Sequence, residues 1–397
     1  MSGMGSMSAL AGGDPLASRQ AEATGFGCGV EMLGYGSEQE LCALFAKMRT
    51  KQDYRLVDQG FRTFSAELLA RGLISMGDYA ELFGGQAVHH LTRDAHGRFV
   101  HVGDRSDAQA LVRSYSLAKY GSMADIRYFA GLMISALRRA LDDPDSALAR
   151  MFDAACANGE QVVMLTTGWR NVPSTANVMY DIVVEQLNLT LAYRALPTII
   201  NVKLPRIAPP CENYASLSLE ERERVSTVQD HILPAENFYR WPGVHVLFGD
   251  DVLVTGATAD KVYAQAMRNG AKSFVAVYPM LLDPLLALSA PATEEVLNTT
   301  MASGRLDDTF AAILGHPEYV PILRSLRTLL DQHNRIDLAG FLPRIAVQNL
   351  LKLYVSALNN EFLADARCGA SLEIIRRYLV RSDVLDAHGN PRATLDA

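Results

Sequence analysis

The stretch that most constrains the fold is residues 244–258, which read VHVLFGDDVLVTGAT. It opens with an apolar run, passes two adjacent carboxylates, Asp250 and Asp251, and continues through three aliphatic residues into a loop of small residues. An apolar run bounded by turn residues is typical of a buried strand. A helical pattern follows over residues 259–269. A strand that leads through a short loop into a helix indicates an α/β fold.

The small-residue loop has the chemistry of a phosphate site. Its members are Thr255, Gly256, Ala257 and Thr258. Backbone N–H groups point outward at a helix N-terminus, and the helix dipole favours negative charge there. The glycine allows close backbone approach, and the two threonines offer hydroxyl donors. Asp250 and Asp251 are suited instead to sugar hydroxyls, or to a divalent metal that bridges to a second phosphate. The alternative is an ordinary strand-turn-helix corner whose acids face solvent.

The whole stretch resembles the signature of type I phosphoribosyltransferases, which is a hydrophobic strand, two acidic residues, two aliphatic residues and a Thr-Gly-x-Thr loop. The resemblance implies the family's doubly wound parallel sheet, here with helical additions at both ends. It also implies that the loop holds the 5-phosphate of phosphoribosyl pyrophosphate, while Asp250 and Asp251 hold the ribose hydroxyls and Mg²⁺. Gly249 departs from the pattern, since an aliphatic residue is usual there. The departure predicts a bend before the acids.

Val254 narrows the acceptor that the resemblance implies. Family members that act on 6-oxopurines have an aspartate at the matching position, where it contacts a ring nitrogen of the base. Valine offers no such contact. Orotate and adenine phosphoribosyltransferases have small or apolar residues there, so this chain is nearer to them, although it lacks the full motifs of either. The resemblance covers about residues 110–285, and within that range only the signature is specific.

Release of pyrophosphate requires cations, and three segments offer them. The loop after the first strand, where the family places its pyrophosphate loop, holds Thr167, Gly168, Trp169 and Arg170. Lys203 and Arg206 follow the second strand, where orotate enzymes carry basic residues. Lys119 lies in residues 116–122, which weakly resemble a Lys-Ser-Gly segment of the same enzymes and would contact pyrophosphate or substrate. For each segment, a solvated surface charge is the alternative.

Four regions follow from the patterns along the chain. We expect a flexible leader at 1–36, a mainly helical region at 37–107, an α/β domain at 108–284 and an all-helical region at 285–397. The resemblance implies that the α/β domain is phosphoribosyltransferase-like. Within the third region, strands are expected at 161–167, 191–202, 244–248 and 273–280, and helices at 108–118, 124–140, 174–187 and 259–269. A long insertion, 204–242, is interpreted as functional because α/β connections are ordinarily short. The C-terminal helices would be a cap over the site, a dimer surface or structural support.

Two further groups of side chains have the chemistry of general bases or of metal ligands. Candidate general bases lie in the insertion, where an exposed helix face explains most of them equally well; they are Glu212, Glu220, Glu221, Glu223, His231 and Glu236. Four histidines lie in a weakly alternating segment, residues 86–104, and their spacing matches no familiar metal site; they are His89, His90, His96 and His101. We expect two or three of these histidines to be surface or hairpin residues.

Composition excludes several classes of protein. A net charge of −7 argues against a general nucleic-acid or anionic-membrane partner. Five scattered cysteines without a CxxC pair are typical of a reduced compartment and support neither disulfides nor zinc. No apolar run approaches the roughly 18 residues of a membrane span, and the leader lacks the features of a signal peptide. We expect a cytoplasmic homodimer that contacts neither nucleic acid nor membrane.

The sequence therefore predicts an enzyme of nucleotide metabolism. It would be a Mg²⁺-dependent glycosyltransferase that moves the phosphoribosyl group from phosphoribosyl pyrophosphate to a nitrogenous acceptor and releases pyrophosphate. Two alternatives use the same sugar-phosphate site. One is a non-catalytic regulator that senses a nucleotide or phosphoribosyl pyrophosphate, and the other is a nucleotide hydrolase with water as the acceptor.

Overall fold

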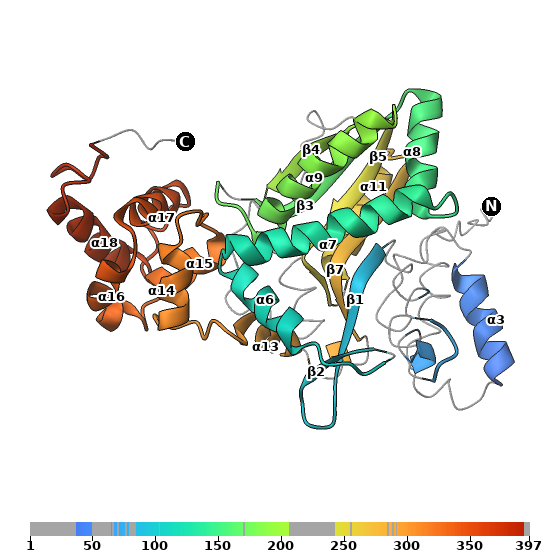
Figure 1. Ribbon diagram of the computed structural model, residues 1–397, viewed down its shortest axis with the longest axis horizontal. Helices are drawn as coiled ribbons and strands as arrows, with labels where there is room; N and C mark the ends of the chain where they lie inside the picture. The colour runs from blue at the N-terminus through green and yellow to red at the C-terminus, as the bar shows by residue number, and fades with distance from the viewer. Residues whose placement is uncertain are drawn as a thin grey trace, which may run out of the picture. The chain divides into compact units, whose positions relative to one another are not determined.

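The computed structural model (Figure 1) describes residues 37–49, 65, 67–69, 71–75, 78, 85–102, 104–169, 171–205, 243–254, 256–283, 286–287, 290 and 292–392. For a few of these only the backbone is described, including Thr167, Gly168, Trp169 and Ala257. The chain divides into two compact units, residues 1–82 and 83–397. Each unit is described by itself below.

The first unit contains α3 (Glu38–Arg49), which begins as the sequence predicts. The Ser37 N–H donates to Glu40 Oε2 over 2.8 Å, and the Glu40 N–H donates to Ser37 Oγ over 3.3 Å. This reciprocal pair is a capping box, which satisfies two N–H groups that the helix start leaves without partners. The rest of this unit, which the sequence predicts to be mainly helical, is described only at residues 65, 67–69, 71–75 and 78. Helical residues 67–69 are followed by a turn at Gly72, whose φ is 71°.

The second unit is built on a mostly parallel sheet with strand order β2-β1-β7-β5-β3-β4, and β6 pairs with β7. Among the described pairs, only β1 with β2 is antiparallel. The strands are β1 (Gly85–Arg93), β2 (Phe99–His101), β3 (Gln161–Trp169), β4 (Ile199–Pro205), β5 (Val244–Gly249), β6 (Val252–Leu253) and β7 (Ser273–Leu282). The expectation of an α/β protein is confirmed.

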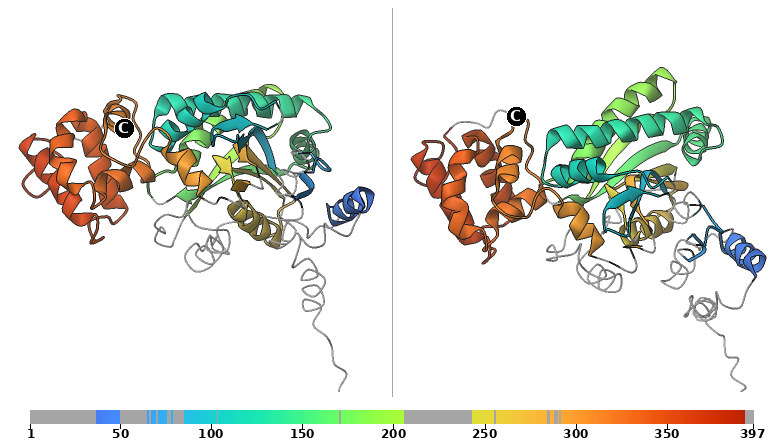
Figure 2. Two further views of the ribbon diagram at one scale, coloured as in Figure 1. Left: turned by 90° about the horizontal axis from the view of Figure 1, so that it is seen from below. Right: turned by 60° about the horizontal axis from the view of Figure 1, so that its bottom comes forward.

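Helices cover both faces of this sheet (Figure 2). On one face lie α6 (Gln109–Lys119), α7 (Met123–Asp142), α8 (Ala147–Asn158) and α9 (Thr175–Tyr193), and on the other lies α11 (Ala257–Arg268). Successive side chains of β5 point to opposite faces of the sheet, so this strand packs against the helices on both faces. Leu247 joins the core beneath α6–α9. Phe248 packs with Phe274 at 6.1 Å between ring centroids, and Tyr263 of α11 packs on Phe274 at 5.4 Å.

Chain order places a topological switch between β3 and β5. From β3 the chain passes through α9 to β4, on one side, and from β5 through α11 to β7, on the other. β3 and β5 pair directly, in parallel, from Gln161↔Val244 to Thr166↔Gly249. In open α/β sheets, ligands bind beyond the carboxyl ends of strands at such a point. Both the predicted acidic pair and the loop after β3 belong to this edge.

Several boundaries differ from the expected ones. The second strand begins at Ile199, since α9 runs to Tyr193 and buries Leu191 in its apolar face. β3 extends to Trp169, with a register shift between Thr166 and Trp169, so Gly168 and Trp169 end the strand and do not lie in a loop. Helix α8 was not expected. The hairpin β1–β2, expected within the N-terminal region 37–107, joins the main sheet through β7.

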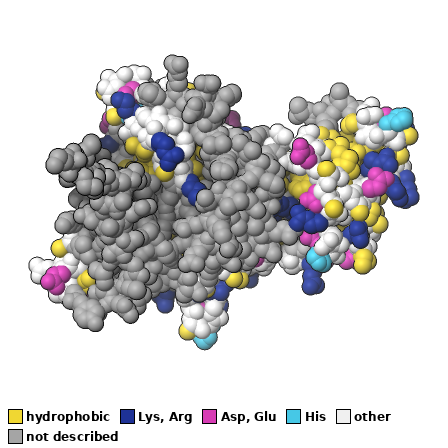
Figure 3. Space-filling view, turned by 180° about the vertical axis from the view of Figure 1, so that it is seen from behind, with side chains coloured by type: hydrophobic (Ala, Val, Ile, Leu, Met, Phe, Trp, Pro, Cys, Tyr) yellow, Lys and Arg dark blue, Asp and Glu magenta, His cyan; other side chains and the backbone are white. Residues whose placement is uncertain are grey.

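The C-terminal part is helical, as expected. Its helices are α13 (Thr293–Thr299), α14 (Asp308–Gly315), α15 (Leu323–Leu330), α16 (Arg335–Phe341), η3 (Leu342–Arg344), α17 (Val347–Asn359) and α18 (Gly369–Arg381). Helices α14–α18 enclose a second core, which also takes in Tyr120 and Val172 from the sheet part of the unit. Seen from behind (Figure 3), their surface mixes Lys and Arg with Asp and Glu around apolar side chains. Ile336 of α16 is 91% exposed.

Within the described ranges, none of the helices combines the length and the apolar character that crossing a bilayer requires.

Candidate functional site

The acidic pair lies where β5 leaves the sheet. β5 is hydrogen-bonded on both sides, to β3 and β7, up to Gly249, and Asp250 and Asp251 follow directly. Asp251 is buried, at 7% exposed, and Asp250 is partly exposed. The Asp251 N–H donates to Asp250 Oδ1 over 2.9 Å. The carboxylates thus stand at the carboxyl edge of the sheet beside the switch point, as the sequence predicted from the order of its elements.

Tyr180 of α9 makes hydrogen bonds to the backbone next to the acidic pair. Its hydroxyl lies 2.7 Å from the carbonyl oxygen of Val277 and 3.2 Å from that of Asp250. Its ring occupies the space that a side chain at Gly249 would take. A Cβ there would lie 2.6 Å from Tyr180 Cε2 and 2.5 Å from Met164 Cε. The departure from the family's aliphatic residue therefore has a structural reason, because the tyrosine ring fills that volume.

Lys119, at the end of α6, contacts Asp251 directly. Its Nζ lies 2.6 Å from Asp251 Oδ2, with the lysine side chain 16% exposed and the aspartate side chain 10%. The Tyr115 hydroxyl, one turn earlier, donates to Asp251 Oδ1 over 3.4 Å. The Lys119 ammonium also lies 5.5 Å from the centre of the Tyr115 ring. Of the three segments that the sequence proposed for cations, residues 116–122 is the one whose cation is described against the acids.

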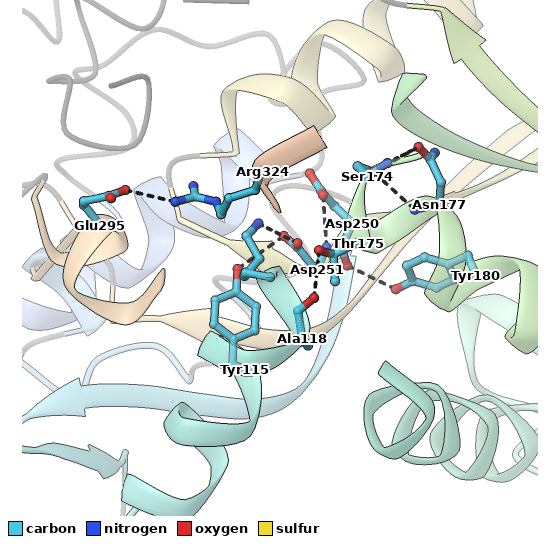
Figure 4. A network of polar contacts seen from close by, with 11 residues as sticks. Tyr115, Ala118, Ser174, Thr175, Asn177, Tyr180, Asp250, Asp251, Glu295 and Arg324 are labelled. Carbon is cyan, nitrogen blue, oxygen red and sulfur yellow. Dashed lines mark hydrogen bonds and ion pairs between the residues drawn. The ribbon is translucent and has the colours of Figure 1, made fainter. Parts of the chain in front are cut away.

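Helix α6 is fixed by two hydroxyls. Ser116 Oγ donates to the Asn298 carbonyl over 2.8 Å and accepts the N–H of Met301 over 2.9 Å. Thr175 Oγ1 donates to the Ala118 carbonyl over 3.2 Å. Thr175 begins α9, whose N-cap Ser174 forms a capping box with Asn177, as Figure 4 shows. The start of α9 and the end of α13 therefore both hold the turn that carries Lys119.

Burial raises the pKa values of two acidic groups in the site, Asp250 and Tyr115. Burial, and next the charge of Asp251, raise the pKa of Asp250 to about 7, against the opposing effect of Lys119. Burial and the same two carboxylates raise the pKa of Tyr115 well above its usual value, so this phenol stays protonated and remains a donor. Asp250 therefore keeps its proton to a higher pH than an ordinary aspartate does.

A second cation, Arg324 of α15, lies beside this cluster (Figure 4). Its Nη1 is 3.5 Å from Glu295 Oε2, and its guanidinium carbon lies 5.9 Å from the centre of the Tyr120 ring. Burial lowers the pKa of Arg324, but Glu295 and Tyr120 outweigh burial and leave that pKa raised. Nothing in the sequence points to Arg324, since it lies far along the chain from the acids and in no motif.

The loop that would hold a phosphate is described in part. Gly256 is the N-cap of α11, with φ 73°, a left-handed conformation that favours glycine. Ala257 is the first helical residue, and the Thr258 side chain is partly exposed. The helix starts two residues before the expected 259. Thr255 lies outside the described residues. The backbone thus has the predicted strand-loop-helix order.

The remaining predicted cations are not gathered at the acids by any described contact. Lys203 Nζ lies 2.8 Å from Asp181 Oδ2 of α9. Arg170, Arg206 and all six candidate general bases lie outside the described residues, and for Thr167, Gly168 and Trp169 only the backbone is described. The four histidines hold no metal cluster, since no group of three or more His, Cys, Asp or Glu side chains in the described part of the chain could bind an ion.

The oxygen donors of the pair fit magnesium only in part. Mg²⁺ is commonly held by one or two carboxylates together with substrate phosphates and water. Asp250 offers such a carboxylate, whereas Asp251 is engaged by Lys119 and Tyr115. The side chains described here would therefore hold the ion only together with oxygens from a ligand.

Comparison with known proteins adds no family. No family model matches the chain, and neither the curated proteins nor the solved structures contain a match.

Proposed function

We propose that the protein is a phosphoribosyltransferase, which transfers the 5-phosphoribosyl group from phosphoribosyl pyrophosphate to a nitrogenous acceptor. The observation that carries the proposal is the position of Asp250 and Asp251. They lie at the carboxyl end of β5, beside a switch point, and a glycine-capped helix starts just beyond them. This is the arrangement in which two carboxylates and a helix N-terminus can bind opposite ends of one sugar phosphate.

In the proposed reaction, the bond from ribose C1 to pyrophosphate breaks and a bond to the acceptor nitrogen forms. The sugar develops positive charge in the transition state, which the carboxylates of Asp250 and Asp251 favour over the neutral ground state. Lys119 holds Asp251 in place and offers an ammonium to the phosphate oxygens. The N–H groups at the start of α11 would bind the 5-phosphate. A bound Mg²⁺ would neutralise charge on the leaving pyrophosphate.

The test is release of pyrophosphate from phosphoribosyl pyrophosphate in the presence of magnesium and a panel of nucleobases. Release that requires a particular base supports the proposal. Release without any base would indicate a hydrolase, and binding without release would indicate a sensor. Either result would replace the proposed function.

Asp251→Asn serves as the first variant. Losing the charge beside the ribose should lower turnover by about two orders of magnitude or more, since a single well-placed electrostatic group contributes on that scale. Circular dichroism should show a folded protein, with the lower stability that an unpaired Lys119 ammonium brings. An active, folded Asp250→Asn/Asp251→Asn double variant would remove the mechanism.

A further inference from the structure

We propose that Arg324 is a binding residue for the diphosphate group of the substrate, and that Glu295 occupies it until that group arrives. The proposal rests on the proposed function and assigns a role in it to the C-terminal helices. No motif in the sequence marks either residue. The inference comes from the geometry of the pair and from its neighbours.

The Arg324–Glu295 pair is loose. The closest nitrogen and oxygen are 3.5 Å apart, and the side chains are 29% and 40% exposed. Charge-assisted hydrogen bonds are ordinarily about 2.7–2.9 Å long. The exposed pair between Arg127 and Glu318 shows such bonds, with two contacts of 2.6 and 2.9 Å. Glu295 therefore compensates the charge of Arg324 without engaging its guanidinium in the two-bond geometry that an oxyanion can use.

Arg324 belongs to the same electrostatic cluster as the acids. Its charge acts on the hydroxyl of Tyr115, which contacts Asp251. The carboxylate of Glu294, next to Glu295, acts on both Asp250 and Arg324. The ring that Arg324 covers is that of Tyr120, the residue after Lys119.

Two neighbouring cations suit a diphosphate. A planar guanidinium binds two oxygens of a phosphate at once, and an ammonium adds a point charge. However, the cluster holds four carboxylates, those of Asp250, Asp251, Glu294 and Glu295, against the two cations Lys119 and Arg324. A bare anion would be repelled by this excess. The ligand that fits is a diphosphate that brings its own divalent cation, and its binding would displace Glu295 from Arg324.

The experiment is a calorimetric titration of the full-length protein with inorganic pyrophosphate in excess magnesium. Arg324→Gln should weaken binding by about tenfold or more, the scale of a hydrogen bond to a charged group. Glu295→Gln should tighten binding several-fold, because it removes the competing carboxylate. Arg127→Gln and Glu318→Gln make the same substitutions in the exposed Arg127–Glu318 pair, and these controls should leave the affinity unchanged.

Opposite effects of the two site variants support the proposal. Wild-type affinity in a folded Arg324→Gln variant would overturn it, as would weaker binding by Glu295→Gln. If Arg324→Gln does not fold, the Glu295→Gln result decides. A wild-type protein that binds no pyrophosphate would overturn the proposed function as well. Pyrophosphate binding that is indifferent to both variants would overturn only the role of Arg324.

Discussion

At the scale of single residues, the Lys119–Asp251 contact is the interaction most sensitive to change. Both side chains are largely removed from water, so removing one leaves the other as a buried, unpaired charge. Lys119→Met should lower the free energy of unfolding by about 3–5 kcal/mol. Urea denaturation monitored by circular dichroism measures the loss.

The double variant Lys119→Met/Asp251→Asn is the control for that prediction. With both charges absent, much of the lost stability should return, because no uncompensated charge is left. Equal stability of the single and double variants would show that the ammonium acts through packing alone.

Because the pKa of Asp250 is raised in the folded chain, we expect the stability of the protein to depend on pH. That pKa is about 7 in the folded chain, whereas an unperturbed aspartate titrates near 3.9. Between these values the folded chain holds a proton that the unfolded chain releases. The contribution of Asp250 to stability is therefore fully present below about pH 4 and is lost as the pH rises to about 7.

Asp250→Asn mimics the protonated carboxyl at every pH. The variant should gain about 2–4 kcal/mol relative to wild type between pH 4 and pH 8, measured by urea denaturation at several pH values. Asp153→Asn, at an exposed position of α8, is the comparison and should shift little. A stability difference that stays constant with pH would contradict the assignment.

At the scale of elements, the end of β5 depends on a glycine. Ala at position 249 would bring its Cβ within 2.5 Å of Met164 and 2.6 Å of Tyr180. Overpacking of this kind costs roughly 1–3 kcal/mol. It would also move the Tyr180 hydroxyl from the carbonyl of Asp250. We expect Gly249→Ala to lower both the melting temperature and the affinity for phosphoribosyl pyrophosphate.

Gly131→Ala is the matched control for that substitution. Gly131 lies inside α7, and a Cβ there meets no atom within 4 Å. Alanine in a helix interior should raise stability by about 0.5–1 kcal/mol relative to glycine. If both variants lose the same stability, the close contacts at Gly249 are not the cause.

Elements with strong local signals could be predicted from the sequence. Ser174 and Ser37 each cap the helix that follows them, and capping is decided within four residues. The start of β4 could not be predicted from the sequence, since Leu191 is apolar and fits either a helix face or a strand. The pairing of β1 with β7 joins segments almost 200 residues apart, so no local pattern encodes it.

The residues of the candidate site also differ in how far the sequence alone predicts them. Asp250 and Asp251 were predicted from one contiguous motif, and their position at the sheet edge agrees with it. Lys119 was one of three proposed cations, and only the fold distinguishes it, by placing α6 beside β5. Arg324 reaches the cluster through packing between distant helices, which a single sequence does not reveal.

At the scale of the whole molecule, the described site residues lie in one unit. Residues 83–397 form a compact body separate from 1–82, and it contains both acids, Lys119 and Arg324. We expect a fragment of residues 83–397 to fold alone and to bind pyrophosphate with magnesium as the full chain does. A fragment that unfolds or loses the affinity would show that the first unit is required.

The same fragment should unfold in a single step. Its two cores share α6, since Tyr115 and Ala118 pack beneath the sheet helices while Tyr120 belongs to the C-terminal core. Losing either core would expose apolar side chains of the other. Calorimetry should give one transition, and two resolved transitions would show that the C-terminal helices are an independent domain.

If the proposed function holds, the anchoring of α6 has a consequence for turnover. Ser116 and Thr175 tie this helix to α13 and α9 without help from any ligand. The conformational entropy of placing the Lys119 ammonium is then lost once, while the chain folds, and not again in each catalytic cycle. Loosening the anchor with Ser116→Ala would return that entropy to the cycle, as a slower reaction in an enzyme whose reacting groups are all still present.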